Sequence, residues 1–266
     1  MGASEMGAKH GSGYIVGPVI KALQVLDYIG ASGREVSLTE VAKAVSLPKT
    51  TVFRYLQTLS STSYLRHDIA NDRYGIGTAF RSLARTDRSL QRLREVATPI
   101  MRKLNREFNE TINLAIESQG WVIYIEIIES TRHLRMQAHI GARDPMHTTA
   151  LGKAILAYLG EAEREKVLCT SLSERTYRTV LDVCVLRKQL NEVRRRGFAV
   201  EIGENEDVSM CVGVPILDDL TFPFAALSLS APVQRHSETL VTSTATALLT
   251  ASREIGEMLR SESLFE

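Results

Sequence analysis

Cysteine, aromatic residues and long apolar runs are all scarce in this chain of 266 residues. The three cysteines, Cys169, Cys184 and Cys211, form no close pairs and are odd in number, which argues against a disulfide framework and favours a reducing compartment. No apolar stretch approaches the ~20 residues of a membrane span, and the N-terminal residues lack the apolar core of a signal peptide. We therefore expect a cytoplasmic protein that makes no contact with the membrane.

Recognisable catalytic and metal-binding patterns are missing as well. The six histidines show no metal-ligand spacing with one another or with cysteine. Gly152-Lys153 is similar to the end of a phosphate-binding loop, but Ala154 stands where a hydroxyl residue would hold Mg²⁺. Lys153 is therefore expected to have a capping or packing role. We predict no catalytic residue, no metal and no cofactor.

Charge is almost balanced over the whole chain but is unevenly distributed. Residues 1–90 contain 11 Lys/Arg and 7 Asp/Glu, whereas residues 91–266 contain 21 and 24. The length suits one small domain followed by one of medium size. A mildly basic first part is compatible with nucleic-acid contact at that end of the molecule.

The pattern of residues 14–78 predicts three helices and a hairpin. Apolar residues recur at helical spacing up to Gly30, and Ser37 with Glu40 fits a capping box that starts a second helix. Pro48 suits the first turn of a third helix. Two short strand-like pieces flank a turn at Asn71-Asp72. This order describes a winged helix-turn-helix.

A winged helix-turn-helix places its second motif helix in the major groove of DNA. The exposed side of that helix carries cationic and hydroxyl side chains, which suit guanine edges and phosphates. Two further arginines flank the hairpin turn. The predicted DNA-binding residues are Ser37, Thr39, Lys49, Thr50, Thr51, Arg54, Tyr55, Arg66 and Arg73.

The remainder of the chain predicts a linker helix over residues 79–96 and a mixed domain over residues 97–266. Pro99 is expected to separate the linker helix from the first helix of this domain. Periodicity predicts helices over 150–159, 161–168, 185–196 and 237–260, and strands over 111–117, 122–129, 134–140, 198–202, 210–217 and 224–230. The fold class is therefore α+β.

Four segments carry a resemblance to a known family. Residues 37–59 resemble the helix-turn-helix of the isocitrate lyase regulator (IclR) family, and Gly141–Ala157 resembles that family's most recognisable effector-domain motif. Residues 196–201, followed by Cys211 and Pro215, are similar to a second motif, and residues 224–232 to a third. The matches occur in order over about residues 17–255.

The resemblance implies a GAF- or profilin-like α/β effector domain and a pocket for a small acid. It also implies dimerisation through the DNA-binding domains and the linker helix, and often a dimer of dimers. In the family, backbone amides and a few polar side chains hold the ligand, and consecutive amides at a helix start suit an anion. Carried over, these are the amides of Ala150 and Leu151 and the side chains of Glu201, Cys211, Ser228 and Ser230.

We therefore predict a ligand-responsive transcription regulator, a repressor of a catabolic operon. Its expected partners are double-stranded DNA with a palindromic operator, a small organic acid, and further copies of itself. Two alternatives remain open at this point. One is an enzyme that converts a small acid and docks through its N-terminal domain. The other is an oligomerisation scaffold, which leaves the polar pocket residues unexplained.

Overall fold

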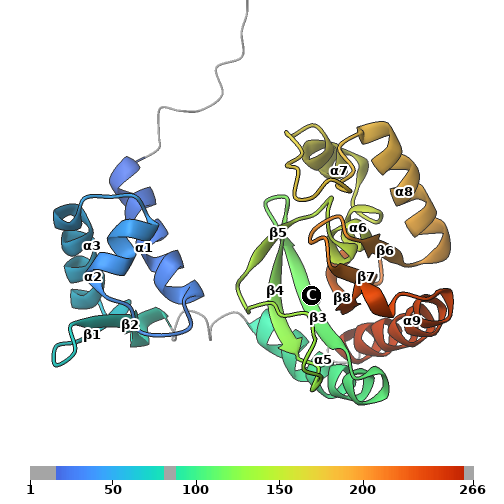
Figure 1. Cartoon of the computed structure of the whole chain (residues 1–266), viewed down its shortest axis with the longest axis horizontal. Coiled ribbons are helices and arrows are strands. Elements are labelled where there is room, and N and C mark those ends of the chain that lie inside the picture. The colour runs from blue at the N-terminus through green and yellow to red at the C-terminus, as the bar shows by residue number, and fades with distance from the viewer. Residues whose placement is uncertain (1–15, 81–87, 261–266) are drawn as a thin grey trace, which may run out of the picture. The chain divides into compact units, whose positions relative to one another are not determined.

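The computed structural model describes residues 16–80 and 88–260, and the chain divides into two compact units, residues 1–86 and 87–266 (Figure 1). We call them the DNA-reading unit and the effector unit. In the described ranges, no helix combines the length and the apolar character that crossing a membrane requires.

The DNA-reading unit contains α1 (Gly17–Ala31), α2 (Leu38–Ala44), α3 (Lys49–Ser61), β1 (Leu65–Asp68) and β2 (Arg73–Ile76). The two strands form an antiparallel hairpin. Part of the apolar periodicity forms one core, but Val19, Ile20 and Leu23 of α1, which share the predicted helical spacing, are exposed. The core contains Val25, Leu26, Ile29, Val36, Val41, Ala42, Val52, Leu56, Leu65 and Tyr74.

Local signals place the ends of these elements. The Ser37 hydroxyl accepts from the amide of Glu40 at 3.3 Å, and the Glu40 carboxylate accepts from the amide of Ser37 at 2.8 Å, so the predicted capping box is present. Ser46, with a φ of 53°, makes the turn to α3, for which Pro48 is the N-cap. The tight connection fixes α3 next to α2.

The effector unit begins with α5 (Arg88–Phe108), which runs through Pro99 without ending. The expected separation of a linker helix from the next helix at Pro99 is therefore wrong. Proline removes one backbone donor, but α5 buries Val96 and Ala97 before it and Met101 and Leu104 after it. Burial on both sides outweighs the lost hydrogen bond.

A six-stranded antiparallel sheet forms the centre of the effector unit. Its order is β5-β4-β3-β8-β7-β6. The connecting helices cover both faces. The strands are β3 (Thr111–Ser118), β4 (Trp121–Ile128), β5 (Arg143–Pro145), β6 (Ala199–Ile202), β7 (Ser209–Leu217) and β8 (Pro223–Pro232).

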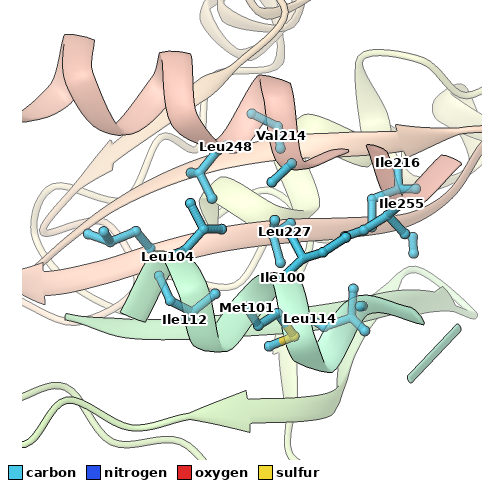
Figure 2. Packing of buried hydrophobic residues seen from close by; sticks show 14 of the residues in the cluster. Ile100, Met101, Leu104, Ile112, Leu114, Val214, Ile216, Leu227, Leu248 and Ile255 are labelled. Carbon is cyan, nitrogen blue, oxygen red and sulfur yellow. The ribbon is translucent and has the colours of Figure 1, made fainter. Parts of the chain in front are cut away.

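One face of the sheet packs against α5 and α9 (Glu238–Arg260). Figure 2 shows Ile100 and Leu104 of α5 and Leu248 of α9 pointing toward the apolar side chains of the strands, such as Leu227. Alternate residues of each strand point to this side. The result is the largest apolar core of the molecule, and it holds α5 and α9 together on the sheet.

The other face carries α6 (Ala150–Leu156), α7 (Glu161–Leu168) and α8 (Val183–Arg196). Asp182 caps α8, and Gly197, with a φ of 86°, ends it. A Cβ at Gly213 of β7 would lie 2.7 Å from the backbone of Ala150. Glycine at this position therefore allows the first turn of α6 to rest directly on the sheet.

The predicted strand over residues 134–140 is not formed. Its alternating pattern is that of a strand, but Leu134 and Ile140 are both more than half exposed. Side chains hold the segment instead: the Thr111 hydroxyl donates to the Met136 carbonyl at 2.8 Å, and Arg235 donates to the Leu134 carbonyl at 2.8 Å. The third strand lies further along, at β5.

Candidate functional site

The first candidate site is the outer side of α3. Val52 and Leu56 face the core, so the opposite side of the helix faces solvent. Lys49, Thr50 and Arg54 are exposed, and Thr51 and Tyr55 are half-buried. This surface presents the hydrogen-bond donors that contacts to a phosphate backbone and to base edges require.

The remaining predicted DNA-binding residues surround the start of α2. Thr39 is exposed, whereas the Ser37 hydroxyl belongs to the capping box. Arg66 pairs with Glu35, and Arg73 donates to Glu40 at 3.3 Å. Arg66 therefore links the hairpin to the segment before α2, and Arg73 links it to the first turn of α2.

Glu40 is the centre of these contacts. The Ser37 amide, together with the side chains of Arg34 and Ser37, lowers the pKa of the Glu40 carboxyl to about 2. An ionised Glu40 accepts from Ser37, Arg34 and Arg73. The charge of Glu40 thus fixes the relation of α2 to the hairpin.

The second candidate site lies on the α6 face of the sheet. Strand register brings polar residues into two adjacent rows on that face. The first row is Glu201, Cys211, Ser230 and Thr111, each directly opposite the next on β6, β7, β8 and β3. The polar residues of the second row are Ser228 and Asn113, and Gly213 lies directly opposite Ser228 on β7.

A cavity of about 220 Å³ opens over these rows. The amides and side chains that the sequence comparison singled out, which lie far apart in sequence, all line it: Ala150, Leu151, Glu201, Cys211, Ser228 and Ser230. The segment 134–140 forms part of the wall through Met136, Gln137, Ala138 and His139. We call this cavity the effector pocket.

The first turn of α6 reaches the pocket because two glycines permit close packing. The Thr149 hydroxyl accepts from the Gly152 amide at 3.0 Å and caps the helix. A Cβ at Gly152 would lie 2.2 Å from the Met146 carbonyl oxygen. With Gly213 below, the backbone of Ala150 and Leu151 is held against the pocket floor.

Burial changes the acid–base properties of the pocket. Burial raises the pKa of the Glu201 carboxyl to about 7, although the amides of Glu204 and Asn205 donate to it and oppose the shift. Burial also raises the pKa of the Cys211 thiol well above its usual value, and the Glu201 charge adds to this. Cys211 is therefore a neutral thiol, with its sulfur 3.1 Å from the Ser230 hydroxyl oxygen.

Asn113 and the residues around Tyr124 are pocket residues that sequence reasoning missed. The Asn113 amide donates to the hydroxyls of Ser230 at 3.0 Å and Ser228 at 3.3 Å. The Tyr124 hydroxyl donates to Asp144 at 3.0 Å. In the sequence, Asn113 and Thr111 are polar residues whose neighbours in the strand are apolar, and both are on the same face of that strand. This pattern was the signal that could have identified Asn113 as a pocket residue.

Lys153 lies behind the pocket, fully buried. Its ammonium donates to the two carboxylate oxygens of Glu204 at 2.5 and 2.7 Å. Lys153 therefore does more than the expected capping or packing, because it forms a buried ion pair with Glu204. The Thr176 and Thr179 hydroxyls donate to the carbonyls of Gly203 and Glu204 at 2.5 and 2.8 Å. These contacts fix the loop that carries Glu204 and the pocket residues Asn205 and Glu206.

Comparison with known protein families agrees with this arrangement. The family described as "Bacterial transcriptional regulator IclR C-terminal" matches residues 88–257, and the "IclR helix-turn-helix domain" matches residues 18–68. The chain belongs to the IclR family. The regulator KdgR of Escherichia coli is 32% identical to this IclR-family chain over 246 residues, which cover 92% of this chain and 93% of KdgR. The transcriptional repressor IclR of Escherichia coli is 31% identical over 238 residues, 88% and 87% of the two chains.

Solved structures of IclR-family proteins share the fold. The IclR protein of Thermotoga maritima has a TM-score of 0.70 and 27% identity, over 91% of this chain and 98% of that one. An IclR homologue from Microbacterium hydrocarbonoxydans, crystallised with 4-hydroxybenzoate, has a TM-score of 0.79 and 26% identity, over 92% and 99%. This IclR-family chain is thus a transcription regulator with an N-terminal helix-turn-helix and a C-terminal α/β domain.

Proposed function

We propose that this regulator is a repressor that leaves its operator when a small organic acid fills the effector pocket. The observation that carries the proposal is the pocket itself: the six residues that the family resemblance selects come from α6, β6, β7 and β8 and line one cavity. The repressors among its relatives support the sign of regulation.

For the DNA half, we propose that Lys49, Thr50, Thr51, Arg54 and Tyr55 contact DNA directly. Their exposure on α3 supports this. Ser37, Thr39, Arg66 and Arg73 contribute at the start of α2 and at the hairpin. Arg66 keeps most of its side chain exposed while it pairs with Glu35, so it can also reach a phosphate.

Self-association belongs to the same proposal. Val16, Val19, Ile20 and Leu23 are exposed at the start of α1, each by more than 40%. An apolar patch of this kind suits a contact between two copies. Two paired DNA-reading units would read a palindromic operator.

For the effector half, the Ala150 and Leu151 amides bind the ligand carboxylate, and Glu201, Cys211, Ser228 and Ser230 contact its remaining polar groups. The homologue crystallised with 4-hydroxybenzoate supports a small acid as the ligand class. An acid that binds one arrangement of the effector units better shifts the population toward it. We propose domains of residues 14–78 and 97–266, joined by a linker of residues 79–96. Residues 81–87 of this linker lie outside the described residues. The linker would transmit the change of arrangement from the effector domain to the DNA-binding domain.

The enzyme alternative is weaker than regulation. The relatives are named as regulators. The pocket thiol has its pKa raised by burial, the opposite of what an activated cysteine nucleophile needs. We therefore propose a binding pocket without turnover, in a protein that works where the DNA is, in the cytoplasm.

The deciding experiment is fluorescence anisotropy with a labelled duplex from the region upstream of the regulator's own gene. A scrambled duplex is the control, and both are measured at two salt concentrations. Tight, salt-sensitive binding that prefers the native duplex, and that an acid reverses, is expected. Equal binding to both duplexes under all conditions, with no response to any acid, would contradict the proposal.

A further inference from the structure

The effector pocket contains two buried hydrogen-bond acceptors that have no partner among the described residues. One is Oδ1 of Asn113, and the other is Oε2 of Glu201. Both residues line the cavity, and their side chains are 2% and 1% exposed. They lie on different strands, β3 and β6, with β8 and β7 between them.

The other atoms of these two side chains are already engaged. The Asn113 amide nitrogen donates to Ser230 and Ser228, and Oε1 of Glu201 accepts from the amides of Glu204 and Asn205. The neighbouring Cys211 thiol is a weak donor that lies against the Ser230 hydroxyl. Each side chain is thus held in place with one acceptor unpaired.

Leaving a buried acceptor unpaired is costly, so a ligand that supplies donors at both ends of the pocket gains affinity over one that does not. The lining as a whole points the same way. It includes the carboxylates of Asp144, Glu201 and Glu206 but, among the residues described, neither lysine nor arginine.

We propose that the effector is a short acid with several hydroxyl groups, and that Asn113 is the residue that selects for those hydroxyls. The proposal rests on the proposed small-acid function and specifies its ligand class. Asn113 Oδ1 accepts from one ligand hydroxyl, and Glu201 Oε2 accepts from another. An acid with only a hydrocarbon or keto chain leaves both acceptors unpaired.

The neutral partners around Asn113 favour a hydroxyl over an ammonium group. A hydroxyl both donates and accepts, so it can bond Asn113 Oδ1 while accepting from the Ser228 or Ser230 hydroxyl. An ammonium group accepts nothing, so it cannot also bond the Ser228 or Ser230 hydroxyl as an acceptor. Amino acids are therefore expected to bind more weakly than hydroxy acids of equal length.

The test uses four-carbon acids that differ only in their substituents. Calorimetry on the full chain measures Kd for 2,3,4-trihydroxybutyrate, 2-hydroxybutyrate, 2-aminobutyrate and butyrate. We expect 2,3,4-trihydroxybutyrate to bind most tightly and 2-hydroxybutyrate next. 2-Aminobutyrate and butyrate should bind most weakly. Trihydroxybutyrate should bind at least about tenfold more tightly than butyrate. Butyrate leaves the buried acceptors unpaired, and the free-energy penalty of an unpaired buried acceptor corresponds to about this ratio of affinities.

Asn113→Leu removes the acceptor and keeps the branched shape of the side chain. We expect it to lower the ratio of the two affinities, trihydroxybutyrate to butyrate, by about fivefold or more. Asn113→Thr, which keeps an oxygen acceptor and favours a strand, should restore part of the ratio and serves if the leucine variant does not fold. The matched control is Asn105→Leu, because Asn105 donates to backbone carbonyls away from the pocket. It should leave the ratio unchanged.

The outcomes separate the two proposals. Binding of butyrate or 2-aminobutyrate as tight as that of trihydroxybutyrate, or an unchanged ratio in Asn113→Leu, would overturn the role of Asn113 while leaving a small-acid effector in place. No binding of these acids, of their six-carbon counterparts gluconate and hexanoate, or of 4-hydroxybenzoate would overturn the small-acid proposal as well.

Discussion

The two units of this regulator treat charge in opposite ways. In the DNA-reading unit, the ion pairs Arg34–Glu40 and Arg66–Glu35 lie at the surface, and Lys49 and Arg54 are exposed. In the effector unit, Lys153–Glu204 is buried, and Glu110, 2% exposed, accepts from Arg235 and Arg132. A surface that meets a polyanion keeps its cations in water until binding. A pocket for a small ligand instead holds most of its polar groups in place through hydrogen bonds before the ligand binds.

The largest effect in this comparison is expected at the buried ion pair. Lys153→Met leaves the Glu204 carboxylate buried without its partner and should lower the free energy of unfolding by about 3–5 kcal/mol. Urea unfolding of the full chain measures it. The double variant Lys153→Met with Glu204→Leu should recover most of the loss, because both charges are then gone. A double variant as unstable as the single one would show that the loss does not come from the unpaired Glu204 charge.

The next effect concerns pH. The Glu201 pKa is raised from 4.5 to about 7, so the folded state retains a proton that the unfolded chain has released. The stability that this proton provides is complete below about pH 4.5 and is lost as pH rises toward 7. Glu201→Gln stays neutral and should be more stable than wild type by up to about 3 kcal/mol at pH 8, with the difference shrinking toward pH 5. Thermal or urea unfolding at several pH values measures this difference in stability. A difference that does not change with pH would show that the pKa of Glu201 is not raised in the folded state.

A smaller effect is expected on the surface of the DNA-reading unit. Arg54→Ala should weaken operator binding by about 1–3 kcal/mol and relax base preference, as loss of a base-reading arginine does. Anisotropy with native and scrambled duplexes measures both. The matched control is Arg195→Ala, which removes another exposed charge, from α8 of the effector unit. Equal losses of operator affinity for the two variants would mean that binding depends on overall charge and not on the position of Arg54.

The smallest effect is expected at the capping box. Ser37→Ala removes the hydroxyl that accepts from the Glu40 amide and should lower the stability of the DNA-reading unit by about 1 kcal/mol. Circular dichroism during thermal unfolding measures it. Ser37→Asp, which can still cap the helix, is the control and should lose less. If the alanine and aspartate variants were equally stable, the cap would contribute little.

Most elements of the fold could be predicted because their signals are local. The capping box at Ser37, the turn residues at Asn71-Asp72 and the glycine at position 197 each mark an element boundary. The helix boundary predicted at Pro99 was wrong because residues before and after Pro99 are buried in the same core. The sequence alone does not show this burial. The segment 134–140 misled because its pattern is that of a strand, while its place is the wall of a pocket.

The pocket could be predicted only as far as the family resemblance reached. Ser228 and Ser230 share a face because they alternate on one strand, which sequence shows. Asn113 joins them only through the pairing of β3 with β8, more than a hundred residues apart, and strand order is not local information. The partner of Lys153 was hidden for the same reason, since Glu204 lies on a loop after β6.

The absence of a side chain at Gly213 has a mechanical consequence. The backbone of Ala150 rests on β7 with no flexible atoms between them, so the first turn of α6 and the strand behave as one solid body. The opposite face of β7 carries α9, which packs on α5. A movement of α6 is therefore expected to move β7 with it, and β7 packs through the apolar core on α9, which contacts α5, the helix at which the effector unit begins.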